Sequence, residues 1–201
     1  MPPKIKPTRF SFTWFHHKDA GAWLVVVLIV TATVWELRRQ GRLWWCECGG
    51  PNPWAGDIWN PHNSQHLFDP YSFTHILHGV LLCGLVAWAC PRLSSSWQLC
   101  LAVAAESLWE MIENTNFIID RYRLTTLAVG YQGDTIANSL GDIFSAVVGF
   151  LLARRLGIRG SIVLFMATEA VLIFWIRDSL LLNVVMLLCP SDTIRAWQMG
   201  L

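Results

Sequence analysis

Long apolar runs separated by polar stretches dominate the chain. Five runs approach the roughly 20 residues that an α-helix needs to cross the hydrocarbon core of a bilayer. The pattern therefore predicts an all-α polytopic membrane helix bundle with about five transmembrane helices, in a single integral membrane domain over residues 1–201. The runs cover about Ala20–Leu37, Tyr71–Ala89, Trp97–Ile118, Thr135–Ala153 and Ser161–Cys189.

Composition agrees with this prediction and narrows the set of partners. Hydrophobic residues make up 54% of the chain and charged residues only 14%, whereas a soluble domain carries about 25% charged residues. A net charge of +1 gives no basic surface for nucleic acid. We expect membrane lipids as partners and no nucleic acid, and a homo-oligomer stays open.

The basic residues suggest an orientation in the membrane. Residues 1–19 form a basic segment before the first run, and no small-residue cleavage site follows, so an uncleaved signal anchor is favoured over a signal peptide. With the N-terminus cytoplasmic, eight basic residues lie inside and six outside, which the positive-inside rule weakly favours. The expected location is the bacterial inner membrane, with a Trp-, Gly- and Pro-rich periplasmic loop over residues 38–70.

Polar side chains interrupt the apolar runs at positions that a five-span topology brings to one membrane face. An ionised acid at the centre of a span costs roughly 2.5–3.5 kcal/mol, so such residues normally face the bundle interior or a wet cavity and mark function. Residues that recur every three or four positions share one face of a helix. The stripes are His75 and His78; Glu106, Glu110 and Glu113; and Asp134, Asn138, Asp142 and Ser145.

The charges of the embedded residues do not balance. Six acids face a single embedded base, Arg177. Protonated carboxyls, protonated histidines, Arg121 and Arg123 reaching in, or a bound cation could supply the missing positive charge. The embedded acids are Glu106, Glu110, Glu113, Asp142, Glu169 and Asp178.

Imidazole and carboxylate ligands converging from separate helices suit zinc or another divalent transition metal. We therefore expect a divalent metal, with zinc favoured, bound by His75, His78, Glu110 and Asp142. The expected catalytic residues are Glu106, Glu113, Asp134 and Arg177: Glu106 or Glu113 as general base on a metal-bound water, and Arg177 as the partner of an anionic group. Because the site would open toward lipid headgroups, the natural substrate is a lipid or lipid-linked molecule.

Less specific interpretations remain open. The two histidines could form interhelical hydrogen bonds, and the acids with Arg177 could form a buried salt-bridge network. A charged cavity could bind or move a solute, ion or lipid without catalysis, and a charged layer could dock partner helices in an accessory subunit. No motif here has the specificity of a known metalloprotease signature.

The loop RLWWCECGGPNPWAGDIWNP contributes two closely spaced cysteines. A disulfide between Cys46 and Cys48 would be strained, and pairing elsewhere, metal contact or free thiols stay open. His66 follows near the expected mouth of the site, and an ordinary loop hydrogen bond is its simplest role. Because His62 and His66, four positions apart, lie in a Pro-containing stretch, helical spacing cannot be assumed for them.

Several long stretches resemble an uncharacterised family of small multi-pass inner-membrane proteins from alphaproteobacteria. They are SQHLFDPYSFTHILHG, ESLWEMIENTNFIIDRYR, YQGDTIANSLGD and WIRDSLLLNVVMLLCPSDTIRAWQ. This resemblance implies an inner-membrane location and little about chemistry. A second resemblance, to VanZ-like membrane proteins, rests on Arg123 before a D-x-x-x-N-x-x-G pattern at Asp134, Asn138 and Gly141, and it implies a cell-envelope or lipid-related role.

Overall fold

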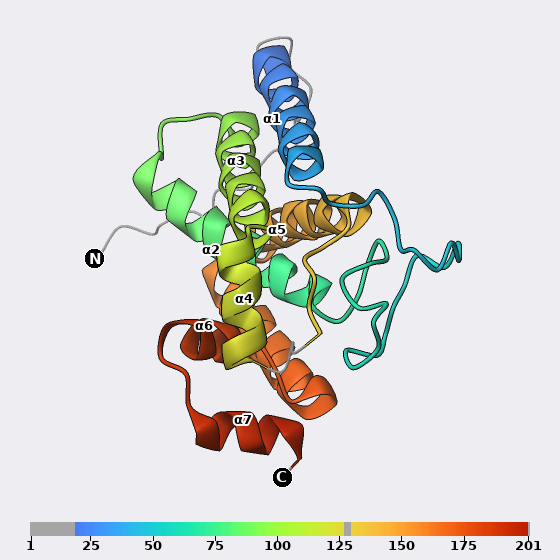
Figure 1. Cartoon of the computed structure of the whole chain (residues 1–201). Coiled ribbons are helices and arrows are strands. Elements are labelled where there is room, and N and C mark those ends of the chain that lie inside the picture. The colour runs from blue at the N-terminus through green and yellow to red at the C-terminus, as the bar shows by residue number, and fades with distance from the viewer. Residues whose placement is uncertain (1–18, 127–129, 201) are drawn as a thin grey trace, which may run out of the picture.

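The computed structural model describes residues 19–126 and 130–200, and this part of the chain contains seven helices and no strand. The prediction of an all-α fold is therefore confirmed. The predicted cytoplasmic segment over residues 1–19 lies, except for Asp19, outside the described residues. The helices are α1 (Ala20–Arg39), α2 (Ser72–Ala89), α3 (Ser95–Glu113), α4 (Asn116–Thr125), α5 (Ile136–Ile176), α6 (Leu180–Leu188) and α7 (Asp192–Met199) (Figure 1).

Three of these helices, α1, α2 and α5, are long and apolar enough to cross a membrane. They support a membrane protein, but the expected count of about five spans is not confirmed. The third apolar run is divided, because α3 ends at Glu113 and α4 starts at Asn116. The fourth run and most of the fifth form the single element α5, which is broken at Gly157 (φ 66°, ψ −179°).

The centre of the fold is the contact between α2 and the N-terminal half of α5. A Cβ atom on Gly149 would lie 1.9 Å from the carbonyl oxygen of Ile76, so only glycine permits this approach of the two backbones. Small residues at helix contacts are typical of membrane bundles. Helix α3 packs against both helices through an apolar core that includes Val103 and Phe150, and α1 lies beside α3 (Figure 1).

The segment between α1 and α2 forms no helix, yet its end is fastened to the start of α5. The amide of Thr135 donates to the carbonyl of Ser64 over 3.1 Å, and Asn138 Nδ2 donates to the carbonyl of His66 over 2.9 Å. These bonds place residues 64–69 beside the N-terminal ends of α2 and α5, where the polar residues of the expected site gather.

Candidate functional site

Two histidines on α2 share one carboxylate on α3. His75 Nδ1 lies 2.6 Å and His78 Nδ1 lies 3.0 Å from Glu106 Oε1. Since a carboxylate accepts hydrogen bonds, both rings donate through Nδ1, which leaves each Nε2 for another partner. Histidines that bind a metal through one ring nitrogen commonly donate a hydrogen bond from the other nitrogen to a carboxylate.

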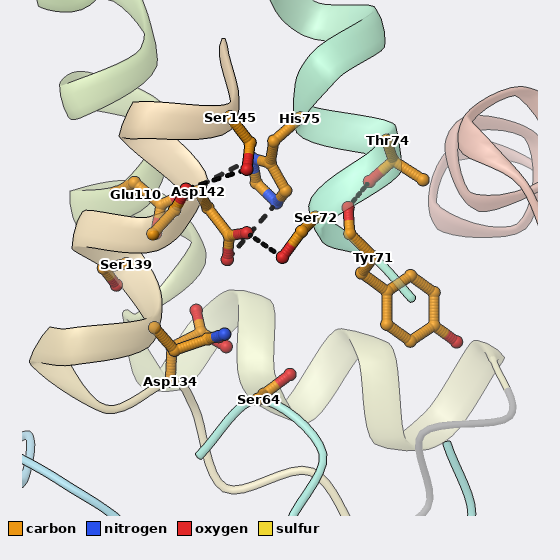
Figure 2. Close-up of polar contacts among 12 residues, drawn as sticks. Ser64, Tyr71, Ser72, Thr74, His75, Glu110, Asp134, Ser139, Asp142 and Ser145 are labelled. Atoms are coloured by element: carbon orange, nitrogen blue, oxygen red, sulfur yellow. Dashed lines mark hydrogen bonds and ion pairs between the residues drawn. The ribbon is translucent and has the colours of Figure 1, made fainter. Parts of the chain in front are cut away.

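The other two predicted ligands lie on either side of the His75 ring. Glu110 Oε1 from α3 is 3.4 Å from His75 Nδ1, and Asp142 Oδ2 from α5 is 3.8 Å from His75 Nε2. The hydroxyl of Ser72 donates to Asp142 Oδ1 over 2.9 Å. Figure 2 shows the three helices converging on this imidazole. All of the side chains are buried, with Glu110 fully so.

Glu110 is the least satisfied residue of the group. Both of its carboxylate oxygens are buried and have no hydrogen-bond partner among the described residues, although His75 lies close enough for an ion pair. Buried polar atoms are nearly always hydrogen-bonded, so an exception calls for an explanation such as a bound ion. One carboxylate oxygen of Glu113 is also buried without a hydrogen-bond partner among the described residues.

A cavity of about 190 Å³ opens beside these residues. His75, His78 and Asp142 reach it from α2 and α5, and Glu113 and Asp134 line its polar side. Glu106 and Glu110 do not line it, so they lie behind the imidazoles. Helix α6 contributes the apolar side chains of Leu180, Val184 and Leu187 to the lining, together with the amide of Asn183.

Asp134 lies just before α5, and both of its carboxylate oxygens accept hydrogen bonds. Tyr131 donates to Oδ1 over 3.0 Å and Asn114 to Oδ2 over 2.8 Å. Burial raises the pKa of the Asp134 carboxyl to about 6, and the two hydrogen bonds act in the opposite direction. Asp134 is therefore a positioned acid at the rim of the cavity, and it titrates much closer to neutrality than an ordinary aspartate.

Lysine and arginine do not line the cavity in the described part of the chain. Arg121 Nε donates to the carbonyl of Leu187 over 2.9 Å, and Arg123 Nε to that of Tyr131 over 2.5 Å. Among the described residues, His75 and His78 are therefore the only basic side chains that line the cavity. Protons or a bound cation must balance the remaining acids.

The structure does not bring Arg177 to the site. Helix α5 ends at Ile176, and Arg177 follows in the left-handed conformation (φ 55°). Its side chain is exposed, and Nη1 lies 3.4 Å from the carbonyl of Trp197 near the C-terminus of α7. Sequence spacing placed Arg177 at the depth of the site, but the end of the helix turns it away.

The deeper acids have structural partners. Glu169 accepts hydrogen bonds from the amides of Leu180 and Leu181, at 3.0 and 3.3 Å, and so caps the start of α6. Asp178 accepts from Tyr71 Oη, also over 3.0 Å, which ties it to the beginning of α2. These two acids belong to the scaffold around the cavity.

Sequence reasoning missed the polar residues that support the cluster from outside the helix interiors. Ser72 orients Asp142, and Asp69 accepts from the amides of Ser64 and Tyr71, at 2.9 and 2.7 Å. Burial raises the pKa of the Asp69 carboxyl, against these bonds. The only available signal was the sequence FDPYS before α2, which is typical of a helix start.

The D-x-x-x-N-x-x-G pattern fastens the loop to α5. Asp134 is held by Asn114, Asn138 bonds the His66 carbonyl, and a Cβ on Gly141 would lie 1.9 Å from the Leu67 carbonyl oxygen. The pattern therefore has a structural role in this chain, at the wall of the cavity.

Comparison with known proteins gives a consistent result. A family described as "Protein of unknown function (DUF2585)" matches residues 37–200. A UPF0314 protein of Paracoccus denitrificans is 40% identical over 187 residues, covering 93% of this chain and 96% of that protein. A UPF0314 protein of Brucella anthropi is 40% identical over 181 residues, covering 90% and 91%, and one of Sphingopyxis alaskensis is 40% identical over 178 residues, covering 89% and 95%. No solved structure gives a significant match.

Proposed function

The chain belongs to the DUF2585 family of proteins of unknown function, and we propose that it is a metal-dependent membrane enzyme that acts on a lipid or lipid-linked substrate. The metal is a divalent ion, with zinc favoured. It binds on the cavity side of His75 and His78, where Asp142 supplies an oxygen.

The observation that carries the proposal is the charge of the buried cluster. Glu106, Glu110 and Asp142 surround His75, and all three are buried. Glu113 and Asp134 add two more acids at the cavity. Even with both imidazoles protonated the cluster would keep negative charge, and buried charge without a partner is strongly unfavourable. A divalent cation bound to the neutral imidazoles supplies two positive charges beside these acids and gives the free oxygens of Glu110 a favourable field, and protons on the other carboxyls balance the remaining negative charge.

The residues then divide into ligands and positioning groups. Because Glu106 accepts hydrogen bonds from both Nδ1 atoms, Nε2 of His75 and His78 is the nitrogen that would bind the metal, which makes Glu106 a positioning residue. Ser72 holds Asp142 in the same way. A divalent metal in such a site would polarise a substrate oxygen or activate a water. Glu113 lines the cavity with one oxygen unpartnered among the described residues, so it is the acid best placed to accept a proton.

The two-sided cavity supports an amphipathic substrate. Its lining combines the imidazoles and acids with aliphatic side chains of α6. A volume of about 190 Å³ suits a headgroup rather than a whole lipid, and acyl chains would remain among the apolar helices. This arrangement is consistent with chemistry at a polar headgroup near a membrane surface.

The test is the metal content and activity of the purified chain in lipid nanodiscs. We expect about one zinc, manganese or iron in this site, lost in a His75→Ala/His78→Ala double variant that still folds, together with turnover of a lipid in a headgroup screen. Glu36→Gln is the matched control, because Glu36 is an acid on α1 that bonds Arg39 and is not among the residues that line the cavity.

One observation favours a non-catalytic role for the same cavity. Glu106 already satisfies both imidazoles through Nδ1, so the histidines are not left without partners when no metal is bound. If metal reloading gives no metal that the His75→Ala/His78→Ala variant loses, the site is an interhelical network that binds a small solute or lipid. A proton-balanced network of that kind would make the variants unfold at a different pH without changing metal content.

A further inference from the structure

A second group of ligand-type side chains lies in the loop before α2, outside the cavity. Cys46, Cys48, His62 and His66 each offer one atom, and these four atoms all lie within 4.8 Å of one another. Cys46 Sγ is 3.1 Å from His62 Nδ1, and Cys48 Sγ is 3.6 Å from His66 Nε2. Both cysteines are free thiols.

These separations match the edges of a tetrahedral zinc site. With zinc–sulfur bonds near 2.3 Å and zinc–nitrogen bonds near 2.05 Å, tetrahedral angles place a sulfur and a nitrogen ligand about 3.6 Å apart. The Cys48–His66 pair has this separation, and the Cys46–His62 pair, at 3.1 Å, is about 0.5 Å closer than the ideal geometry. Two thiolates and two imidazoles are also a ligand set that proteins use for structural zinc.

The surroundings of the four side chains fit bound metal. His66 Nδ1 bonds the carbonyl of Asn52, which leaves Nε2 directed at Cys48. The amide of Cys48 donates to Cys46 Sγ, and the amide of Gly50 donates to Cys48 Sγ, both over 3.4 Å. A backbone carbonyl on the second nitrogen of a ligating histidine is the usual outer contact at a metal centre.

The sequence spacing agrees with the geometry. Two cysteines near one turn are followed by two histidines with three residues between them, in the order of known Cys₂His₂ zinc sites. The first pair departs from the common spacing, because one residue rather than two separates Cys46 from Cys48. The turn that brings them together closes with a hydrogen bond of 3.1 Å from the amide of Gly49 to the carbonyl of Cys46.

We propose that Cys46, Cys48, His62 and His66 bind one zinc ion in a closed structural site. Four protein ligands complete the tetrahedron, so this ion has no open position for a substrate. The site is separate from the cluster around His75 and goes beyond the function proposed above.

The zinc ion would fix the wall of the cavity. Its ligand His66 lies within the segment that Asn138 bonds on α5, and Ser64, two residues earlier, lines the cavity. The loop from Cys46 to His66 contains no helix or strand to hold it. A metal that joins its two ends therefore closes the loop and restricts its conformations when bound.

The first experiment replaces zinc by cobalt in the whole protein. Co²⁺ bound by two thiolates gives a sulfur-to-metal charge-transfer absorption, which a site of histidines and carboxylates does not give. We expect this band in the wild type and in the His75→Ala/His78→Ala variant, with about one zinc displaced from the loop site per chain. The band disappears in Cys46→Ser/Cys48→Ser and persists in Cys189→Ser, which removes an exposed thiol elsewhere.

A second experiment needs no variant and so does not depend on the folding of one. Iodoacetamide labelling of the intact chain, read by mass spectrometry, should modify Cys46 and Cys48 on the order of ten-fold more slowly with zinc than after chelation. The labelling of Cys189 should not change. Equal rates with and without zinc, or a disulfide between Cys46 and Cys48 in the purified protein, would overturn the proposal. Neither result would bear on the cavity site.

Discussion

The two clusters use histidine in opposite settings. His75 and His78 lie on a helix, separated by one turn and surrounded by buried acids from α3 and α5. His62 and His66 lie in a segment without helix or strand and face two thiols. Helix packing fixes the first cluster whether or not an ion is bound, whereas in the second the ligands themselves hold the loop. The difference predicts that the cavity cluster tolerates metal removal and the loop cluster does not.

The largest expected effect comes from breaking the packing under the first cluster. Gly149→Leu forces a side chain into the backbone of α2 and should cost about 3 kcal/mol or more, with loss of folded yield in detergent. Gly84→Leu is the matched control, because nothing lies within 4 Å of a Cβ placed there. Equal yields of the two variants would show that α2 and α5 do not pack through this glycine. Thermal unfolding followed by circular dichroism gives the measurement.

A sharper test separates the two acids on α3 that face His75. Glu106→Gln removes the charge that accepts from two imidazoles, and hydrogen bonds to charged groups contribute about 1.5–3 kcal/mol each. Glu110→Gln removes a charge whose oxygens have no hydrogen-bond partner among the described residues, so it should leave the unfolding free energy within about 1 kcal/mol. Chemical denaturation of both variants without metal measures the difference, and a larger loss for Glu110→Gln would contradict the assignment.

With metal present, Glu110→Gln should also change metal affinity. Glu110→Gln weakens binding at the cavity, by roughly 10- to 100-fold for a residue near the ligands, while the loop site keeps its affinity. Competitive titration with a chelating dye measures both sites. An unchanged cavity affinity would remove Glu110 from the metal centre.

The contact between the two regions can be cut at Asn138. Asn138→Ala loses the bond to the His66 carbonyl and a longer one of 3.4 Å to Asp69, at about 1–3 kcal/mol for a buried group left unpaired. Hydrogen exchange should increase in residues 62–69 and stay unchanged in α3. Asn183→Ala, which removes an amide that lines the cavity from α6, is the control that should leave the loop protected.

The sequence predicts the cluster around His75 better than the loop cluster. Helical spacing predicted that His75, Glu110 and Asp142 meet, because residues of one stripe on each of three packed helices must face one another. The count of about five spans is not confirmed, because Asn114 and Thr115 interrupt the third run and Gly157 breaks α5, features that hydropathy does not detect. The loop cluster has no periodicity to read, since its four ligands meet through turns and a long-range bond to α5.

The smallest effect is expected at Arg177, which the sequence places at the site and the structure places outside it. Its guanidinium is exposed, and its left-handed backbone suits glycine better than arginine. Arg177→Gly should therefore keep metal binding and headgroup turnover, with the unfolding free energy within about 1 kcal/mol of the wild type, since relief of the backbone strain offsets the loss of the contact with Trp197. A loss of turnover at unchanged stability would return Arg177 to the site and would mean that the end of α5 rearranges when substrate binds. Because the variant alters neither cluster, that result would concern the substrate alone, and it would identify the missing positive charge of the cavity.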